Sequence, residues 1–407
     1  MRVGILGGGM QGCCCALALA EGGAEVTLFD RNERLLSRAA VANEGKVHLG
    51  YMYANDPSHA TARTMMNGAL AFAPFFRRHL EIEAESFSVS EPAAYVVHRD
   101  SQRTAAQISD YLARVHGMIA EAARSGPQGY FGRDLSDPPR RWSAAKIEAE
   151  FDPGIALAAF DTPEIAVNPV ALAEAVRERI DANRRIDVRL GHEILAVEDL
   201  DRPIVHTEDH AGGARHRFDH VINALWDGRL AIDETLGLRP GRPWLHRLKY
   251  GVSFRLPEHA RHPPSATFVS GPFGEVVSYR DGLVYLTWYP VCLRGISRDV
   301  APPGWPTYPD EPLRTEIVRG TLSAMTEFVV ALRELAPEDL AEVTVKGGVI
   351  VAWGATDIYD PRSELHRRYE IGVTSNRHFH SVDPGKLTMA PHFAQICAER
   401  ILASAAS

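Results

Sequence analysis

The chain has 407 residues, of which 45% are apolar and 24% charged, and its formal net charge at pH 7 is -8. These proportions are ordinary for globular proteins and exclude collagen-like, fibrous and intrinsically disordered classes. The length predicts more than one domain, or one nucleotide-binding fold with a large insertion. The acidic balance disfavours nucleic acid or an anionic membrane as the main partner, because both attract a concentrated positive field.

Cysteine usage and the first residues bear on the compartment of the protein. Five Cys, three of them consecutive at positions 13–15, show neither the spacing of a disulfide framework nor that of a zinc site, so no metal is predicted. Arg2 and the Ala-rich stretch after it resemble a signal peptide, but glycines interrupt the apolar run. Because no segment reaches the roughly 18 uninterrupted apolar residues of a membrane span, we expect a soluble, cytoplasmic protein.

The first thirty residues have the pattern of a βαβ unit. Residues 2–6 are an apolar run before three glycines, which is typical of a buried parallel strand that enters a tight turn. Small and apolar residues predict a helix over 10–21, stopped by Gly22-Gly23, and a second strand over 25–29. The unit has the length expected of a nucleotide-binding fold.

Between the first strand and the helix, Gly7, Gly9 and Gly12 form a GxGxxG motif. Gly7 permits the tight turn, Gly9 lets a pyrophosphate approach the backbone, and Gly12 lets the helix pack closely on the strand. The amino terminus of the helix then faces the phosphate charge. Asp30, at the end of the second strand, is suited to bind a ribose and to repel a 2'-phosphate. The motif predicts a dinucleotide without specifying which one.

The rest of the chain mixes helical and strand patterns. Helical spacing predicts helices over 55–80, 102–125, 168–181, 314–335 and 390–403. Alternating apolar residues predict strands over 86–98, 187–190, 194–197, 203–207, 220–224, 343–352 and 369–374, and prolines predict a loop over 126–145. Between 249 and 293, runs rich in Val, Tyr and Thr are separated by turn dipeptides, which predicts antiparallel hairpins.

The predicted fold class is α/β, or α+β overall, with a Rossmann-like nucleotide-binding domain and a discontinuous substrate domain built mainly on an antiparallel sheet. We expect residues 1–85, 150–235 and 345–407 in the nucleotide-binding domain. Residues 86–149 and 236–344 are expected in the substrate domain.

Several stretches resemble the D-amino-acid oxidase (DAO) superfamily of FAD enzymes. The run from Gly7 to Gly12 and the stretch from Ala16 to Arg31 are similar to the start of that family, and residues 168–175 and 221–224 resemble later segments of it. The resemblance is scattered along the whole chain. It implies a bound FAD, with contacts from Gly7, Gly9, Met10, Gln11, Gly12, Asp30, Arg31 and Ala224. We expect non-covalent binding, because neither Cys292 nor Cys397 lies in a recognisable attachment motif.

Residues 43–51, NEGKVHLGY, resemble the flavin-contacting loop of the 2-hydroxyglutarate and glycerol-phosphate dehydrogenase branches. The resemblance implies flavin contacts from Asn43, Gly45, Lys46 and Val47, and it brings His48 near the reacting carbon as a base or an orienting donor. A neutral imidazole can accept a hydroxyl proton while hydride leaves for the flavin. A histidine that only packs under the ring and bonds a backbone carbonyl is an alternative of equal weight.

Residues 381–391, SVDPGKLTMAP, resemble the loop that returns to the flavin before the last helix. The resemblance implies that Gly385, Lys386, Leu387 and Thr388 lie near the pyrimidine end, where Lys386 adds positive charge. A Pro-Gly turn that merely caps the last helix is the alternative. The run 224–229, ALWDGR, departs from the Ala-Gly pair that the family commonly has after the returning strand.

Substrate contacts are expected from the antiparallel segment, because Arg or Lys can hold a carboxylate or phosphate and Tyr or Trp can wall the flavin face. The candidates are Lys249, Tyr250, Tyr279, Arg280, Trp288, Tyr289 and Arg294. The catalytic candidates are His48, Tyr51 and Trp288. The basic pair Arg367 and Arg368 is interpreted as solvated surface.

These features predict an FAD-dependent oxidoreductase, either a dehydrogenase or an oxidase. Its expected reaction is hydride removal from a CH–OH or CH–NH carbon of a small polar metabolite, giving a ketone or an imine. The expected partner is that small molecule, with no nucleic acid and no membrane span, and the electron acceptor is oxygen or another compound. A nicotinamide-dependent dehydrogenase that uses the same GxGxxG, and a flavin-binding protein without turnover, are the alternatives.

Overall fold

The computed structural model describes residues 1–82, 87–125 and 129–404, whose strands form three sheets. The first, here called the parallel sheet, has the strand order β16-β17-β9-β1-β2-β5. Neighbouring strands in it run parallel, except that β16 and β17 form an antiparallel pair. Its strands are β1 (Arg2–Leu6), β2 (Glu25–Phe29), β5 (Ile186–Arg189), β9 (His220–Asn223), β16 (Gly372–Asn376) and β17 (Phe379–Asp383).

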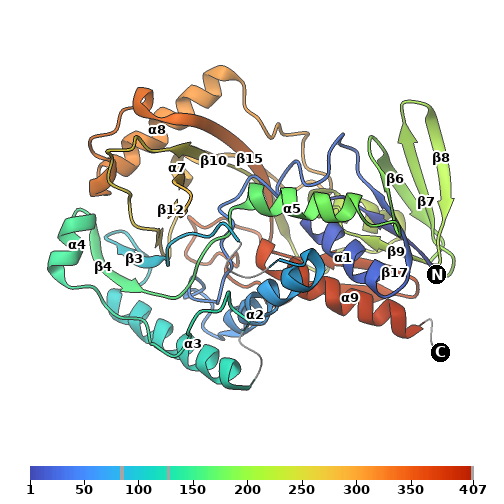
Figure 1. The fold of residues 1–407 in the computed structure, drawn as a ribbon, viewed down its shortest axis with the longest axis horizontal. Coiled ribbons are helices and arrows are strands. Elements are labelled where there is room, and N and C mark those ends of the chain that lie inside the picture. The colour runs from blue at the N-terminus through green and yellow to red at the C-terminus, as the bar shows by residue number, and fades with distance from the viewer. Residues whose placement is uncertain (83–86, 126–128, 405–407) are drawn as a thin grey trace.

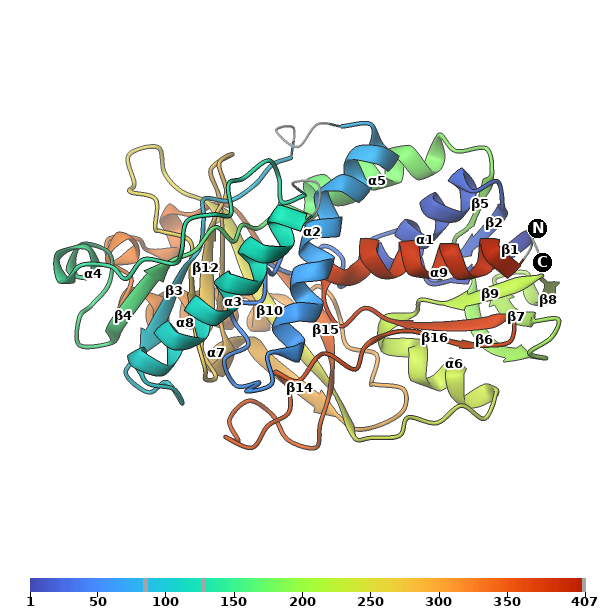
Figure 2. The same cartoon turned by 90° about the horizontal axis from the view of Figure 1, so that it is seen from below.

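Helix α1 (Met10–Glu21) connects β1 to β2 and is buried along its length up to Ala20, because its residues are small or apolar. Helix α9 (Ala390–Ser404) runs beside α1, as Figure 2 shows, and α5 (Pro169–Asp181) also contacts α1. The three consecutive cysteines lie on α1 with free thiols and no exposed surface, so they are packing residues.

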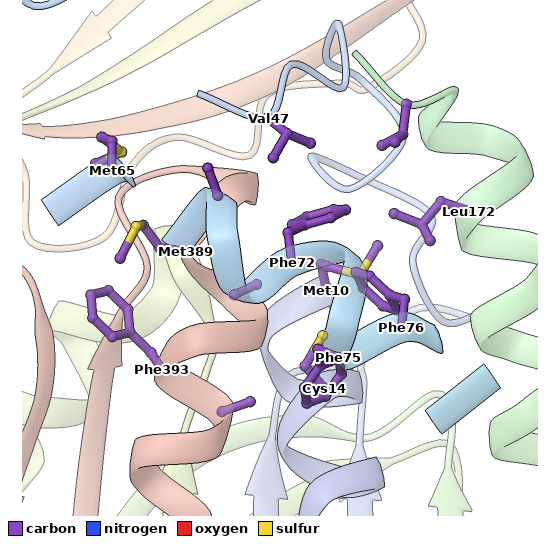
Figure 3. Close-up of a cluster of buried hydrophobic side chains, with 14 of the residues drawn as sticks. Met10, Cys14, Val47, Met65, Phe72, Phe75, Phe76, Leu172, Met389 and Phe393 are labelled. Atoms are coloured by element: carbon purple, nitrogen blue, oxygen red, sulfur yellow. The ribbon is translucent and has the colours of Figure 1, made fainter. Parts of the chain in front are cut away.

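A large apolar cluster joins these helices to α2 (Ala60–Leu80), which crosses next to them. In Figure 3, Met10 of α1 lies near Phe72 of α2 and Leu172 of α5, and Val47 enters the same cluster from a loop. Helix α3 (Ala105–Ser125) contacts α2 on the outside of the molecule (Figure 2). One apolar core therefore extends from the parallel sheet through α1, α9 and α5 to α2 and α3.

The second sheet, here called the antiparallel sheet, has the order β14-β10-β13-β12-β11-β3-β4. Strand β10 is long: β14 and β13 pair with successive parts of one of its edges, and β15 pairs with the other edge. Among the described strands of this sheet, only β11 and β3 pair in parallel. Figure 1 shows the two large sheets toward opposite ends of the molecule. The strands are β3 (Ala94–His98), β4 (Ala156–Asp161), β10 (Trp244–Arg255), β11 (Ala266–Phe268), β12 (Gly274–Ser278), β13 (Leu283–Trp288), β14 (Leu293–Ser297) and β15 (Ala341–Trp353).

Smaller elements complete the fold. The third sheet joins β6 (Glu193–Glu198), β7 (Ile204–Asp209) and β8 (Gly212–Arg217), all antiparallel. The remaining α-helices are α4 (Ala144–Glu150), α6 (Arg229–Thr235), α7 (Tyr289–Cys292) and α8 (Glu311–Thr326), with short 3-10 turns η2 (Trp226–Gly228), η3 (Val330–Leu332), η4 (Pro337–Asp339) and η5 (Leu387–Met389). Among the described helices, none has both the length and the apolar character needed to cross a membrane.

The predicted fold class is confirmed, while several element boundaries differ from prediction. The helix expected over 314–335 starts earlier, because the Asp310 side chain accepts a hydrogen bond from Leu313 N at 3.0 Å, and it ends at Thr326. Strands β4, β8 and β17 and helix α6 were not predicted, since they are short and lack a long apolar alternation. The start of the strand expected at 86, the domain boundary at 85 and the start of the loop expected at 126 lie outside the described residues.

The sheets suggest a division into two domains that differs slightly from the expected one. Strand β4 pairs with β3, and β15 pairs with β10 over most of its length, so both belong to the antiparallel sheet. Both also lie at least partly in ranges expected for the nucleotide-binding domain. We propose two discontinuous domains, one around each large sheet, with β4 and β15 in the substrate domain.

Candidate active site

The turn between β1 and α1 is held tightly from two sides. Gly7 has φ +101°, and a Cβ placed on it would lie 2.8 Å from the carbonyl oxygen of Ala224, at the end of β9. A Cβ on Gly12 would lie 1.9 Å from the carbonyl oxygen of Gly7, so the first turn of α1 packs directly on the loop. A Cβ on Gly9 would meet nothing within 4 Å. Only the middle glycine of the motif therefore borders open space.

Helix α1 presents free backbone donors beside that space. Gly9 is its N-cap and provides no side-chain hydrogen bond to the first amides. Asp30 lies across the turn, where its Oδ2 accepts from Gly8 N at 2.8 Å and its Oδ1 accepts from Asn32 N at 2.8 Å. The amide groups, the helix dipole and the open approach at Gly9 together fit an anionic phosphate chain.

A cavity of about 530 Å³ extends from this turn to the antiparallel sheet. The predicted site residues that line it are Gly7, Gly9, Met10, Gln11, Asp30, Arg31, Asn43, Lys46, His48, Ala224, Gly385, Lys386 and Leu387. Segments far apart in the sequence thus meet around one space. Strand β10 contributes Arg247 and Lys249, and the loop after β14 contributes residues 301–304.

Four predicted cofactor residues, Gly12, Gly45, Val47 and Thr388, are not among those that line the cavity, and they shape its wall from behind. Gly45 has φ +67°, and a Cβ on it would lie 1.8 Å from the carbonyl oxygen of Val167. Val47 is fully buried, and its N–H donates to Ile165 O at 3.0 Å. The Thr388 hydroxyl accepts from His48 N at 3.0 Å and donates to Lys46 O at 3.2 Å.

His48 lines the cavity and is almost fully buried. Its Nδ1 lies 3.1 Å from Oε1 of Glu164, whereas Nε2 has no hydrogen-bond partner among the described residues and lies 4.0 Å from Oε1 of Glu44. Burial lowers the pKa of His48 below its ordinary value, and the charges of Lys386 and Lys46 act in the same direction, while Glu164 opposes them. His48 is therefore neutral near pH 7, and one nitrogen is free of any partner.

The structure places the other two catalytic candidates away from the cavity wall. Tyr51 is buried in the core, and its hydroxyl lies 3.3 Å from Nδ1 of His116. Trp288 packs among Phe273, Phe328 and His98. Neither residue is among those that line the cavity.

Of the substrate-contact candidates, Lys249 and Tyr289 line the cavity. The others have partners elsewhere. Tyr250 donates to Pro306 O and Tyr279 donates to Glu44 O, while Arg280 and Arg294 form exposed ion pairs with Glu91 and Glu316. Lys249 and Arg247 share a face of β10, and this i, i+2 spacing is a sequence signal by which Arg247 could have been found.

Arg368 corrects the interpretation of the basic pair. Arg367 is half-exposed and pairs with Glu364, but Arg368 is only 6% exposed and lines the cavity. Its guanidinium donates to Gly385 O at 2.7 Å and to Leu365 O at 3.0 Å. No carboxylate of the described residues forms an ion pair with it, and burial lowers the pKa of Arg368. Arg368 lies in an irregular loop, where no periodic pattern of apolar residues in the sequence predicts that its side chain is buried.

Buried charges from the antiparallel sheet and from the loops that contain Lys46 and Lys386 meet at the cavity. Lys46 Nζ lies 2.8 Å from Oε2 of Glu275, and Lys249 Nζ lies 3.9 Å from both Glu44 and Glu275. Burial lowers the pKa of Lys386 to about 8, with Arg368 and Lys249 acting in the same direction and Glu44 opposing them. With Arg247, which pairs with Asp357 at 2.8 Å, and Arg368, the lining cations outnumber their carboxylate partners. This wall is suited to an anion.

The cavity wall also contains buried polar atoms that have no hydrogen-bond partner within the described part of the chain. They are Gln11 Oε1, His48 Nε2, Tyr53 OH, Arg247 Nε, Ser270 Oγ and His366 Nδ1. Buried polar groups are normally paired, so such a concentration indicates a polar ligand. Within the described residues, no cluster of His, Cys, Asp and Glu has the arrangement of a metal site.

Comparison with known proteins identifies the class. The family described as FAD dependent oxidoreductase (DAO) matches residues 2–400, so the chain belongs to this family. It is an FAD-dependent oxidoreductase. This family assignment is chosen over the two alternatives, a nicotinamide-dependent dehydrogenase and a flavin-binding protein without turnover.

Solved structures share the fold over almost the whole chain. The L-alpha-glycerophosphate oxidase of Mycoplasma pneumoniae, solved with FAD bound, is 16% identical, with a TM-score of 0.65 and coverage of 99% of this chain and 94% of that one. The glycine oxidase of Geobacillus kaustophilus is 15% identical, with a TM-score of 0.67 and coverage of 98% and 95%. Among curated proteins, the FAD-dependent monooxygenase FPY4 of Fusarium mangiferae is 44% identical over 52 residues, which span 13% of this chain and 14% of that protein.

Two glycine substitutions separate folding from cofactor binding. Gly12→Ala inserts a methyl group 1.9 Å from Gly7 O, so we expect the apoprotein to lose about 1–3 kcal/mol of unfolding free energy in denaturant titrations. Gly9→Ala inserts it into open space at φ -77°, so apoprotein stability should change by less than about 0.5 kcal/mol while the flavin content of the purified protein falls. Full flavin content in Gly9→Ala would contradict this assignment of the turn.

Proposed function

We propose that the ADP half of FAD binds at the turn Gly7–Gln11 and Asp30, and that its flavin ring lies against the wall formed by Lys46, His48 and the loop 385–387. The open backbone at Gly9, the uncapped start of α1 and the orphaned polar atoms support this fit. Gly12, Gly45, Val47 and Thr388 then hold this wall in shape without facing the cavity. Binding is non-covalent, since Cys292 and Cys397 do not line the cavity.

The proposed reaction is oxidation of a CH–OH or CH–NH carbon in a small metabolite that carries an acidic group. Bound FAD supplies a two-electron acceptor for hydride. His48 accepts the proton from the substrate hydroxyl or amine at Nε2, since it is neutral and this nitrogen has no partner. The unpartnered Nε2 on the wall of a cationic cavity is the observation that carries the proposal.

The acidic group of the substrate is assigned to Arg368, with Lys249 and Lys386 on the same cavity wall. A buried guanidinium that bonds only backbone carbonyls retains donors for a carboxylate or phosphate, and it binds such groups strongly where water is excluded. Tyr53 and Tyr289 supply polar edges and aromatic surface nearby. Hydroxy acids and amino acids both satisfy this arrangement.

The proposal is tested by anaerobic mixing of the yellow holoprotein with hydroxy acids, amino acids and their uncharged amides. We expect bleaching by at least one acid and a much weaker response to its amide. Arg368→Met should raise the substrate concentration for half-maximal bleaching about 10- to 100-fold, the loss expected for a hydrogen bond to a charged group. Arg367→Met, a change in the exposed neighbour, is the control and should leave this concentration unaltered. Equal effects of the two variants would contradict the assignment.

The charge of Lys386 predicts an alkaline limit. Its ammonium group is lost as pH rises through about 8, so kcat/KM for an anionic substrate should fall above that pH. Lys386→Arg keeps the positive charge, because a guanidinium does not deprotonate in this range, and should move the limit out of the measured range. Steady-state kinetics between pH 6 and pH 10 check this, and an unmoved limit in Lys386→Arg would assign it to another group.

A further inference from the structure

Glu164 is a fully buried carboxylate that faces His48 from behind the cavity wall. It follows β4 in the chain, and it is not among the residues that line the cavity. Its Oε2 accepts from Leu49 N at 2.7 Å, and its Oε1 receives both His48 Nδ1, at 3.1 Å, and the hydroxyl of Tyr95. Two groups from the adjacent residues His48 and Leu49 and one from β3 thus converge on one carboxylate.

This carboxylate is ionised. Burial by itself raises the pKa of Glu164, but His48, through its charge whenever it is protonated and through its hydrogen bond, lowers it, and Lys46 and Tyr95 act in the same direction, so that the pKa lies below its ordinary value. A charged carboxylate only accepts hydrogen bonds, so His48 must donate through Nδ1. The proton of neutral His48 is therefore on Nδ1, and Nε2 carries the lone pair.

We propose that Glu164 is a positioning residue that makes His48 a base: it fixes the Nδ1–H tautomer and the ring orientation, and it stabilises the imidazolium formed during the reaction. The inference rests on the proposed function. In the step concerned, the substrate O–H or N–H proton moves to Nε2, the hydrogen on the carbon leaves with the electron pair of the C–H bond as a hydride that bound FAD would accept, and a C=O or C=N bond forms. One substrate is oxidised and one FAD is reduced by two electrons.

Other charged groups around His48 favour or disfavour its protonated form, the imidazolium. Glu44 lies 4.0 Å from Nε2 and, like Glu164, favours the imidazolium, whereas Lys46 and Lys386 disfavour it. Tyr53 meets the imidazole edge-on, with ring centroids 5.9 Å apart. Because Glu164 is the only one of these groups within hydrogen-bond distance of an imidazole nitrogen, among the described residues, it alone can select the tautomer.

Glu164→Gln tests the tautomer with little change in volume. An amide has one acceptor oxygen, so its NH₂ group must face either Leu49 N–H or His48 Nδ1. In the second arrangement His48 accepts at Nδ1 and carries its proton on Nε2, where it cannot act as a base. We expect anaerobic flavin reduction to slow about 10²- to 10⁴-fold on its pH plateau, the usual contribution of a general base. Loss of the negative charge should also move the acid limb to lower pH.

A second measurement needs no substrate. In holoprotein with ¹⁵N-labelled histidine, the imidazole signals of His48, assigned by their loss in His48→Gln, should report a proton on Nδ1 in the wild type and on Nε2 in Glu164→Gln. Tyr95→Phe removes one donor but leaves the carboxylate, so it should keep the Nδ1–H tautomer. Flavin absorbance and thermal unfolding verify that each variant folds and binds FAD.

The outcomes separate the two proposals. A wild-type Nε2–H tautomer, or a Glu164→Gln variant whose tautomer and acid limb both match the wild type, overturns the role of Glu164. If no acid reduces the wild-type flavin, the proposed function fails, and the imidazole signals still decide which nitrogen of His48 carries the proton and whether Glu164 selects it. If reduction occurs and is equally fast in His48→Gln, the base is another group and Glu164 loses its proposed role.

Discussion

The pairing of residues 45–47 with residues 165–167 is the contact on which the site depends. Val47 N donates to Ile165 O, and Val167 N donates to Gly45 O at 2.9 Å, so the two segments run antiparallel through the core. In an extended segment, alternate side chains point to opposite sides. Val47 therefore enters the apolar cluster of Figure 3, while Lys46 and His48 line the cavity. The close approach at Gly45 leaves no room for a side chain.

The same segment ties together the two large sheets. Lys46 pairs with Glu275 of β12, His48 is bound by Glu164 after β4, and its backbone N–H is bound by Thr388 before α9. Burying such charges is costly unless each finds partners, and the partners here come from β12, from the segment after β4 and from the turn before α9. The cavity wall is therefore formed by segments far apart in the sequence, and the cavity extends without interruption from the GxGxxG turn to the antiparallel sheet.

The parts of the cavity wall that could be predicted from the sequence are those that local geometry requires. The GxGxxG turn could be predicted because local geometry requires glycine there: Gly7 has a positive φ, and Gly12 approaches the backbone of Gly7 too closely for a side chain. Most residues that the resemblance named in the loops at Asn43 and Gly385 lie on the cavity wall. Tyr51 was a catalytic candidate, but the chain turns between His48 and Tyr51, where Gly50 has φ +113°, and Tyr51 lies in the core.

Other members of the site depend on contacts distant in sequence. Glu164 is 116 positions from His48 in the chain, and nothing in its immediate surroundings marks it as a partner. Arg368 looks like a surface residue beside Arg367, and only the packing of its loop against Gly385 buries it. Such residues require a structure, because the chain between them carries no signal of their proximity.

The central claim is that flavin and an anionic substrate meet in one cavity. It is tested most directly by titrating the holoprotein with a short carboxylic acid that lacks an oxidisable hydrogen, while recording the visible flavin spectrum. We predict a saturable shift of the flavin bands that weakens strongly in Arg368→Met and persists in Arg367→Met. Calorimetrically detected binding of the acid without any spectral shift, or an equal shift in both variants, would contradict the account.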